Sequence, residues 1–360
     1  MSFRLILDPA DTMAIGDGRP FNQADTGRAI AASVFPPPPD TVYGAARVAC
    51  ARALGWDGVG SWSATIANTM GDWTDTGKFK IAGPFFSVDG ELLLPIPSHV
   101  ALKIVDQNGR ELVRRMPAAD PIMTDLGEIR LLDIPPYDIS TKYLPLAGRW
   151  GKAGAVLKLL SGEVPTVEEL GVPNPPPEPP GWSPDDLAAA EFRVGLARDI
   201  GSRKAIDGHL YAATRRALRK GVEMSVEVEG VSQPDVFDVA VPLGGEARFA
   251  FASAAEASGI PATPDPTPGK YLVYFASPVV MEPPVPRGAV SGLPGQLVTA
   301  SIAGVASHGG RQQDQRTKSH MVLPAGSVLF MESGINSPLP ARIGDKTHMG
   351  YGRYFIGEWT

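Results

Sequence analysis

Four consecutive prolines near the N-terminus constrain the fold of this chain more than any other feature. They stand at positions 36–39 of the run FPPPPDTVYGAAR, which covers residues 35–47. Proline fixes φ and has no amide donor, so this segment is stiff and cannot lie inside a sheet. Asp40 or Thr41 is the predicted N-cap of a helix that runs to about Leu54, and Gly55 is expected to end this helix.

The residues before the prolines predict a strand and an exposed loop. Ser2 to Leu7 alternates apolar side chains, which indicates a strand with one buried face. The run GDGRPF follows at residues 16–21, and its proline biases Arg19 away from helix. We expect Arg19, with Phe21 beside it, to point toward a phosphate or a base. The alternative is a structural ion pair between Arg19 and Asp11 or Asp17.

Composition describes a globular chain with a sizeable core and many turns. Hydrophobic residues make up 43% and charged residues 20% of 360 residues, with 40 glycines and 36 prolines. The single cysteine, Cys50, excludes an internal disulfide and fits a reducing cytoplasm, and we expect it to be buried in the predicted helix. The net charge of −6 is unusual for a free-standing nucleic-acid-binding protein, so binding of that kind would need a local basic face.

Nothing in the sequence predicts a membrane segment. The N-terminus lacks a basic stretch followed by a long apolar run, so it does not resemble a signal peptide. The longest apolar run, residues 271–281, is too short to span a bilayer, which needs roughly 20 residues. We therefore expect a cytoplasmic protein without membrane contact.

The remaining periodicities predict a strand-rich α+β chain in two parts. The cleanest strand is Val222 to Glu229, in which apolar residues alternate with glutamates and a serine. Other predicted features are a hairpin at Asp89-Gly90, a helix within 141–160, and strands at 246–251, 270–275 and 327–331. The proline-rich run 173–184 is either a stiff linker or a surface loop. As a linker, it separates domains at 1–172 and 185–360.

Common catalytic signatures are absent from the sequence. There is no Walker A motif, no GxSxG, and no HExxH or CxxC spacing. Leu243-Gly244-Gly245-Glu246 carries a single acid and cannot hold the two metals of a nucleotide polymerase. We expect no metal, no cofactor and no small-molecule substrate. One catalytic alternative is a metal-independent endoribonuclease that uses His308 or His320 as general acid or base.

Basic residues gather in three stretches that could neutralise RNA phosphates. The members are Arg198, Arg203, Lys204, Arg215, Arg216 and Arg219 in the first, Arg311, Arg316 and Lys318 in the second, and Arg342, Lys346 and Arg353 in the third. Each could equally be a solvated face. For 215–220 that alternative is an exposed helix end, which favours cations.

A glycine-rich turn near the C-terminus offers a second mode of RNA contact. In Gly350-Tyr351-Gly352-Arg353 the glycines leave backbone amides accessible to a phosphate, and Tyr351 could stack on a base. The alternative is that Tyr351 and Phe355 are core residues of a final strand.

The order of these motifs resembles one family of the RAMP superfamily. The family is the small subunit of type III-B (Cmr) CRISPR effector complexes that lies at the 5′ end of the guide RNA. The motifs that carry the resemblance are GDGRPF (16–21), FPPPPDTVYGAAR (35–47), GPFF (83–86), LPIP (94–97), the block from Gly195 to Tyr211, LGGEAR (243–248), PAGSV (324–328), MGYGR (349–353) and GEW (357–359). The chain departs from the family where Ile302-Ala303-Gly304-Val305 replaces a frequent Gly-Trp pair.

The resemblance implies two ferredoxin-like (RRM-like, RAMP) domains with long loop insertions. It implies a non-catalytic subunit that binds the repeat-derived 5′ tag of the crRNA, the large palm/cyclase subunit and the adjacent backbone RAMP subunit. Arg47 and His209, which lie in matching motifs, join the expected RNA contacts, as does His320. A protein-only scaffold with little RNA contact is the remaining alternative.

Overall fold

A computed structural model describes residues 2–16, 30–71, 77–105, 109–124, 127–133, 141–172, 179–233, 238–257, 269–281, 288–294, 298–301, 319–333 and 340–359. The chain forms two compact units, each assembled from separate segments. Unit 1 comprises Met1–Phe79, Pro184–Glu256 and Ala300–Ser319, and unit 2 comprises Lys80–Ser183, Ala257–Thr299 and His320–Thr360. This division differs from the expected domains at 1–172 and 185–360, because each unit draws on both halves of the chain.

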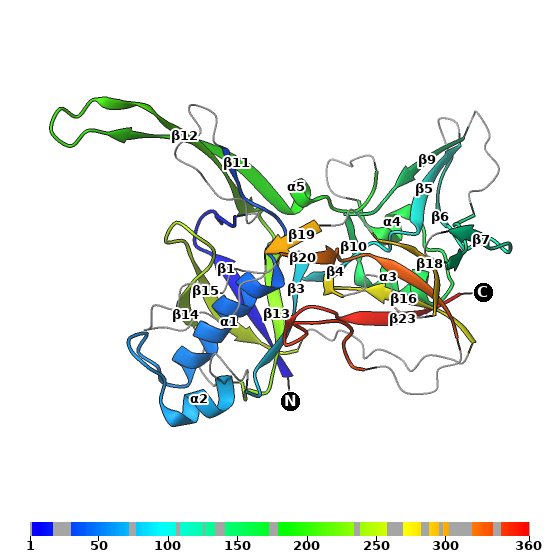
Figure 1. Ribbon diagram of the computed structural model, residues 1–360, viewed down its shortest axis with the longest axis horizontal. Helices are drawn as coiled ribbons and strands as arrows, with labels where there is room; N and C mark the ends of the chain where they lie inside the picture. Colours follow the sequence, from blue (N-terminus) through cyan, green and yellow to red (C-terminus); the bar gives the residue numbers. More distant parts are fainter. Residues whose placement is uncertain are drawn as a thin grey trace. The chain divides into compact units, whose positions relative to one another are not determined.

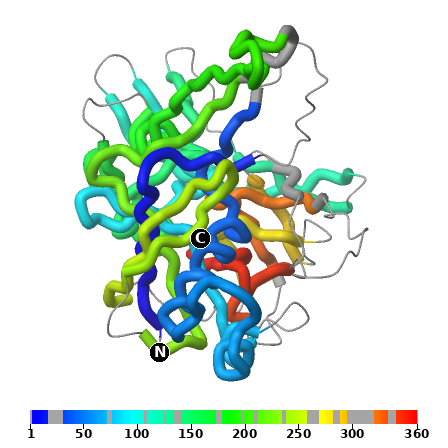
Figure 2. The backbone as a smooth tube through the Cα atoms, turned by 90° about the vertical axis from the view of Figure 1, so that its left-hand side faces the viewer, coloured from blue at the N-terminus to red at the C-terminus, as the bar shows by residue number. Residues whose placement is uncertain are grey.

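Unit 1 combines antiparallel strands with two longer helices (Figure 1). Its elements are β1 (Ser2–Pro9), β2 (Ile30–Ala32), α1 (Pro39–Ala53), α2 (Ala64–Met70), α5 (Pro184–Leu187), β11 (Ala188–Arg198), β12 (Ala205–Leu218), β13 (Val222–Glu229), β14 (Asp238–Pro242) and β15 (Phe249–Ala255). Strands β13, β1, β15 and β14 lie side by side in that order (Figure 2, β1 in dark blue), and we call them the β1 sheet.

One face of the β1 sheet forms the core of unit 1. Phe3, Leu5 and Leu7 of β1 are fully buried, as are Val226 and Val228 on β13. The helix α1 contributes its own buried stripe, which includes Val42, Ala45, Ala46 and Ala49, and lies on this side of the sheet (Figure 1). The predicted strands at 2–7 and 222–229 and the helix are confirmed. The predicted cap is not, because α1 begins at Pro39 and its N-cap Pro38 offers no side-chain hydrogen bond.

Unit 2 contains strands of several sheets and two clusters of buried apolar residues. Its elements are β3 (Lys80–Val88), β4 (Glu91–Pro95), β5 (Val100–Val105), β6 (Gly109–Arg114), β7 (Ile122–Thr124), β8 (Gly127–Ile129), β9 (Thr141–Pro145), β10 (Trp150–Lys152), α3 (Ala153–Leu160), α4 (Val167–Leu170), β16 (Gly269–Phe275), β17 (Val279–Val280), β18 (Ala289–Leu293), β21 (Val328–Ser333), β22 (Met349–Gly350) and β23 (Tyr354–Glu358). Two further strands, β19 (Val298–Ser301) and β20 (Ser319–Leu323), lie where the chain passes between the units.

The centre of unit 2 is the sheet β18-β21-β16-β23, packed on α3 and β4. Tyr274 and Phe355 stack within this core, and the Tyr274 hydroxyl donates a 2.6 Å hydrogen bond to the carbonyl of Pro95. The hairpin at Asp89-Gly90 is confirmed between β3 and β4. The helix predicted within 141–160 is correct only for α3, because residues 141–145 and 150–152 pair as strands.

The described part of the chain contains no helix of the length and apolarity needed to cross a membrane. The same described residues contain no group of histidine, cysteine and acidic side chains that could hold a metal ion. Cys50 is buried, as expected, and burial raises the pKa of its thiol to about 12.

Candidate nucleic-acid interface

The hairpin β11–β12 carries exposed basic side chains at its closed end. The two strands pair from Ala188↔Leu218 to Arg198↔Ala205, and the parallel strand β2 joins β12 near its middle. Figure 1 shows the hairpin, in green, extending beyond the β1 sheet of the same unit. The predicted helix end at 215–220 is therefore wrong: residues 215–218 belong to a strand, because they pair with residues 188–191 of β11.

A turn at Asp199–Lys204 closes the hairpin, with two cations in the turn and a third at the end of β11. The Asp199 carboxylate accepts a 2.6 Å hydrogen bond from the Ser202 amide, which lowers the pKa of Asp199. The Arg203 amide donates to the Asp199 carbonyl, and Arg203 has a positive φ of 56°. We call Arg198, Arg203 and Lys204 the hairpin tip. All three side chains are exposed, and no described residue forms an ion pair with them.

One face of the hairpin is apolar and open to solvent. Phe192, Val194 and Leu196 alternate along β11, so they share a face. Their exposed fractions are 61%, 57% and 45%, and Ile200 in the turn is 96% exposed. A cationic tip beside exposed apolar and aromatic side chains suits single-stranded RNA, whose phosphates need cations and whose bases need flat or apolar surfaces.

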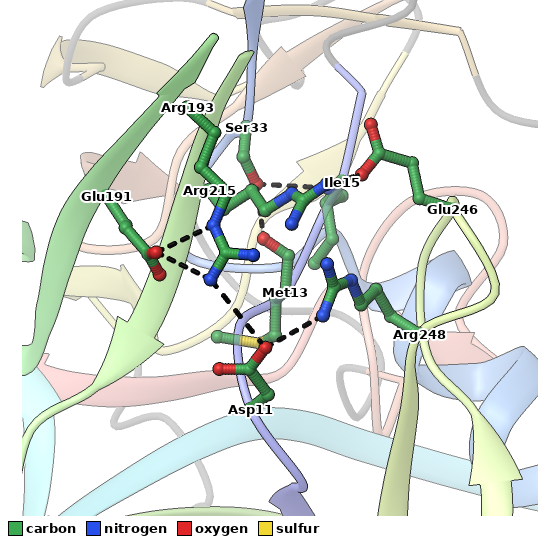
Figure 3. Close-up of polar contacts among 9 residues, drawn as sticks. All are labelled: Asp11, Met13, Ile15, Ser33, Glu191, Arg193, Arg215, Glu246 and Arg248. Carbon is green, nitrogen blue, oxygen red and sulfur yellow. Dashed lines mark hydrogen bonds and ion pairs between the residues drawn. The ribbon is translucent and has the colours of Figure 1, made fainter. Parts of the chain in front are cut away.

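An ion-pair cluster fixes the base of the hairpin (Figure 3). Asp11 accepts from Arg248 at 2.8 Å and lies 3.9 Å from Arg193, which also pairs with Glu191 at 2.6 Å. Arg215, on the neighbouring strand, pairs with Glu246. These contacts join β11 and β12 to the end of β1 and to the turn before β15. Asp11 thus has two arginine partners among the described residues.

Backbone hydrogen bonds reinforce this base. Met13 and Arg216 exchange amide–carbonyl bonds of 2.6 and 3.0 Å. The Ser33 hydroxyl donates to the Met13 carbonyl and accepts from the Ile15 amide at 3.0 Å (Figure 3). The segment 11–15 therefore connects the hairpin, β2 and the β14–β15 turn. These contacts hold the base of the hairpin in place within unit 1.

Arg47, an expected RNA contact, has a structural position instead. Its guanidinium donates to the carbonyls of Met70 and Gly71 at 3.2 and 2.8 Å, at the C-terminal end of α2. The same group lies 4.4 Å from the centre of the Trp62 ring. A cation at a helix C-terminus satisfies otherwise unpaired carbonyls. This arrangement gives Arg47 a role in fixing α2 on α1.

The C-terminal glycine turn is part of the core of unit 2. Tyr351 is 1% exposed, so its ring has no face open to a base, and Phe355 is equally buried. A Cβ on Gly352 would lie 1.9 Å from the Ile343 carbonyl oxygen, and Gly352 has a φ of 74°. Gly350 also has a positive φ, of 104°. The expected stacking role of Tyr351 is therefore replaced by the core alternative, and Gly352 is required by close packing.

Arginines of the same region serve the backbone of unit 2. The Arg353 guanidinium lies 5.4 Å from the Phe355 ring, and the Arg353 amide donates to the Ser277 hydroxyl at 2.9 Å. Arg342 donates to the carbonyls of Ile81 and Thr347. Arg342 and Arg353 thus both contact other residues of unit 2.

The other expected site residues do not join the hairpin tip in the described part of the chain. Arg19, Phe21, Arg311, Arg316, Lys318 and His308 lie outside the described residues, as does the side chain of His209, whose backbone belongs to β12. His320 is partly buried within β20. Sequence reasoning missed the apolar stripe of the hairpin, although the alternation Phe192, Val194, Leu196 was a strand signal.

Comparison with known proteins agrees with the sequence resemblance. A search of curated protein sequences found no significant match. Among the solved chains that match, two are 15% identical to this chain, and each match covers 91% of this chain and 86% of the other. One comes from a cryo-EM structure of the type III-B Cmr-beta bound to cognate target RNA, with a TM-score of 0.47. The other comes from the Cmr-beta bound to cognate target RNA and AMPPnP, with a TM-score of 0.45. The model of the CRISPR-associated family Cas_Cmr3 matches residues 5–359, and the chain therefore belongs to that family.

Proposed function

We propose that this chain is a non-catalytic subunit of a type III-B CRISPR effector complex that binds the repeat-derived 5′ tag of the crRNA. In this role it also docks the large palm-type subunit onto the adjacent backbone RAMP subunit, and so takes part in antiviral defence. Membership of the Cas_Cmr3 family over residues 5–359 supports the assignment to the complex. The observation that supports RNA binding is the exposed hairpin tip, whose base is held by the ion-pair cluster.

The proposed mechanism is positional. The hairpin tip supplies cations that attract phosphates, while the neighbouring stripe of Phe192, Val194 and Leu196 offers apolar contact to bases. The ion-pair cluster at the base limits how far the hairpin can swing, so less ordering is needed when RNA binds. Within this proposal, each unit derives from a ferredoxin-like RAMP domain, and the β1–α1 pair is the beginning of one of them.

Binding of a 5′-tagged crRNA to the full chain, assembled with the other subunits of its complex, tests the RNA part of the proposal. We expect the triple variant Arg198→Ala, Arg203→Ala, Lys204→Ala to lose affinity at least tenfold. The dependence of log K on log salt should become shallower by about 0.7 for each phosphate contact removed. The control variant Lys80→Ala, Lys142→Ala removes exposed charges from unit 2 and should bind as the parent does.

Unchanged affinity and salt dependence in the triple variant would contradict the role of the hairpin tip. The same preparation, incubated with repeat RNA, addresses the endoribonuclease alternative. Site-specific cleavage that disappears in His320→Ala would make the chain an enzyme and overturn the non-catalytic part of the proposal. Partner binding without RNA contact would favour the scaffold.

A further inference from the structure

The open face of the β1 sheet, opposite the core, carries a pair of exposed phenylalanines. Side chains alternate along β15, so Ala250 and Ala252 are buried, while Phe249 and Phe251 point the other way. Each ring is 46% exposed, and the two rings meet edge to face with centroids 5.6 Å apart. Cross-strand pairing places Ala240 and Pro242 of β14 beside them. Large aromatic side chains held at the surface of a sheet are typical anchors of an interface.

The same face is acidic. Strand register places Asp8, Glu227, Glu229 and Asp238 on the side of the phenylalanines, together with Glu223. Arg4 is the basic residue that register adds to this face, and it pairs with Glu223 at 3.3 Å. The sign of the charge separates this surface from the hairpin tip. An acidic surface repels the phosphates of RNA and attracts lysine and arginine side chains.

A depression adjoins the phenylalanine pair. It has a volume of about 230 Å³ and lies where β1 ends and β15 begins, lined by Ala10, Asp11, Thr12, Glu246, Ala247, Arg248 and Phe249. The depression therefore suits one side chain of a partner, packed on Phe249.

These features select one class of occupant. A nucleic acid would bring phosphates against several carboxylates. A second copy of the chain, in a two-fold contact, would bring the acidic face against itself. A protein surface with lysines or arginines around an apolar side chain matches both the charge and the rings.

We propose that the open face of the β1 sheet docks a basic segment of another protein subunit, with Phe249 and Phe251 as its anchors. This inference rests on the proposed function, because it requires that the chain work inside a multi-subunit complex. It adds that the open face of the β1 sheet contacts a protein subunit, whereas the hairpin tip contacts RNA.

Carbodiimide crosslinking of the assembled complex tests the proposal, since this reagent joins carboxylates directly to lysine amines. We expect Asp8, Glu227 or Asp238 to link to lysines of one other subunit, and β1 and β15 to gain protection from hydrogen exchange on assembly. The variant Phe249→Ser, Phe251→Ser should retain that subunit at least tenfold less well. The variant should stay folded with a modest fall in melting temperature, because about half of each ring is already exposed.

Val59→Ser is the matched control, since Val59 is 78% exposed in the same unit and lies off this face. Links only to a second copy of the chain, photocrosslinks from this face to RNA, or unchanged retention of partners in the double serine variant would each overturn the proposal. These outcomes leave RNA binding by the hairpin tip intact. If the hairpin triple variant loses RNA binding, that result supports the proposed function. If the same variant keeps its crosslinks, that result separately supports protein docking on the β1 sheet.

Discussion

The hairpin tip and the C-terminal glycine turn have similar sequences and opposite surroundings. Gly201-Ser202-Arg203-Lys204 and Gly350-Tyr351-Gly352-Arg353 both combine glycine with arginine in a tight turn. At the tip the side chains are exposed. At the C-terminal turn Tyr351 is buried, and Gly352 packs against the Ile343 carbonyl. A glycine–arginine turn therefore indicates ligand binding only where the surrounding residues leave the arginine exposed. Where they bury the turn, its residues contribute to packing.

The largest expected effect is on the C-terminal turn. Gly352→Ala should lower the free energy of unfolding of unit 2 by about 3 kcal/mol or more, because a Cβ would meet a carbonyl oxygen at a positive φ. Denaturant unfolding measures it. The control is Gly154→Ala, at a helical position where no atom lies within 4 Å of an added Cβ, and it should leave unit 2 as stable or more so. Equal stability of the two variants would show that the turn is not tightly packed.

Two arginine substitutions sharpen the comparison. Arg342→Ala should destabilise unit 2 by about 2 kcal/mol, because the carbonyls of Ile81 and Thr347 lose their donor. Arg203→Ala should change stability by less than about 0.5 kcal/mol but weaken crRNA binding roughly tenfold. Unfolding and RNA titrations on both variants give the two readouts. The comparison breaks if Arg342→Ala weakens RNA binding without a loss of stability.

Acid should affect the core of unit 2 through His99. Burial, with repulsion from Arg114 and Arg115, lowers the pKa of His99 to about 3. Between that value and the ordinary pKa of about 6.5, the unfolded chain binds a proton that the folded chain refuses. Stability should therefore fall as the pH falls below 6.5, by about 1.4 kcal/mol per pH unit, or about 2 kcal/mol at pH 5.

The check for His99 is unfolding of the parent and of His99→Leu at pH 7 and pH 5. The leucine variant should lose less stability on acidification, whereas carboxylates titrate alike in both proteins. Parallel pH profiles would mean that His99 is protonated in the folded state.

The smallest expected effect concerns the base of the hairpin. Asp11→Asn removes the carboxylate that pairs with Arg248 and lies 3.9 Å from Arg193, which keeps its ion pair with Glu191. Because these pairs are partly exposed, the loss of stability should stay within about 1 kcal/mol. We expect crRNA affinity to fall two- to threefold, since the hairpin loses part of its orientation. An affinity equal to that of the parent would show that backbone pairing alone fixes the hairpin.

The sequence predicted those elements whose pattern is local. The strand at 222–229, the turn at Asp89-Gly90 and the buried stripe of α1 follow from alternation, turn chemistry and helical spacing. The role of Arg47 was not local: its guanidinium acts on carbonyls more than twenty residues away. The burial of Tyr351 depends in the same way on neighbours such as Ile343. The presence of a basic residue in the sequence could not distinguish an exposed cation from one that already binds backbone carbonyls.

The pairing of β1 also determines when unit 1 can fold during synthesis. Ser2 lies opposite Glu229, and Arg4 opposite Ala255, so β1 leaves the ribosome more than two hundred residues before its partners. Until then Phe3, Leu5 and Leu7 have no sheet to complete. A nascent chain that exposes such a strand is open to aggregation and suits protection by chaperones. Ribosomal stalling before residue 229 would therefore leave unit 1 unfinished, however much of the N-terminal sequence is already available.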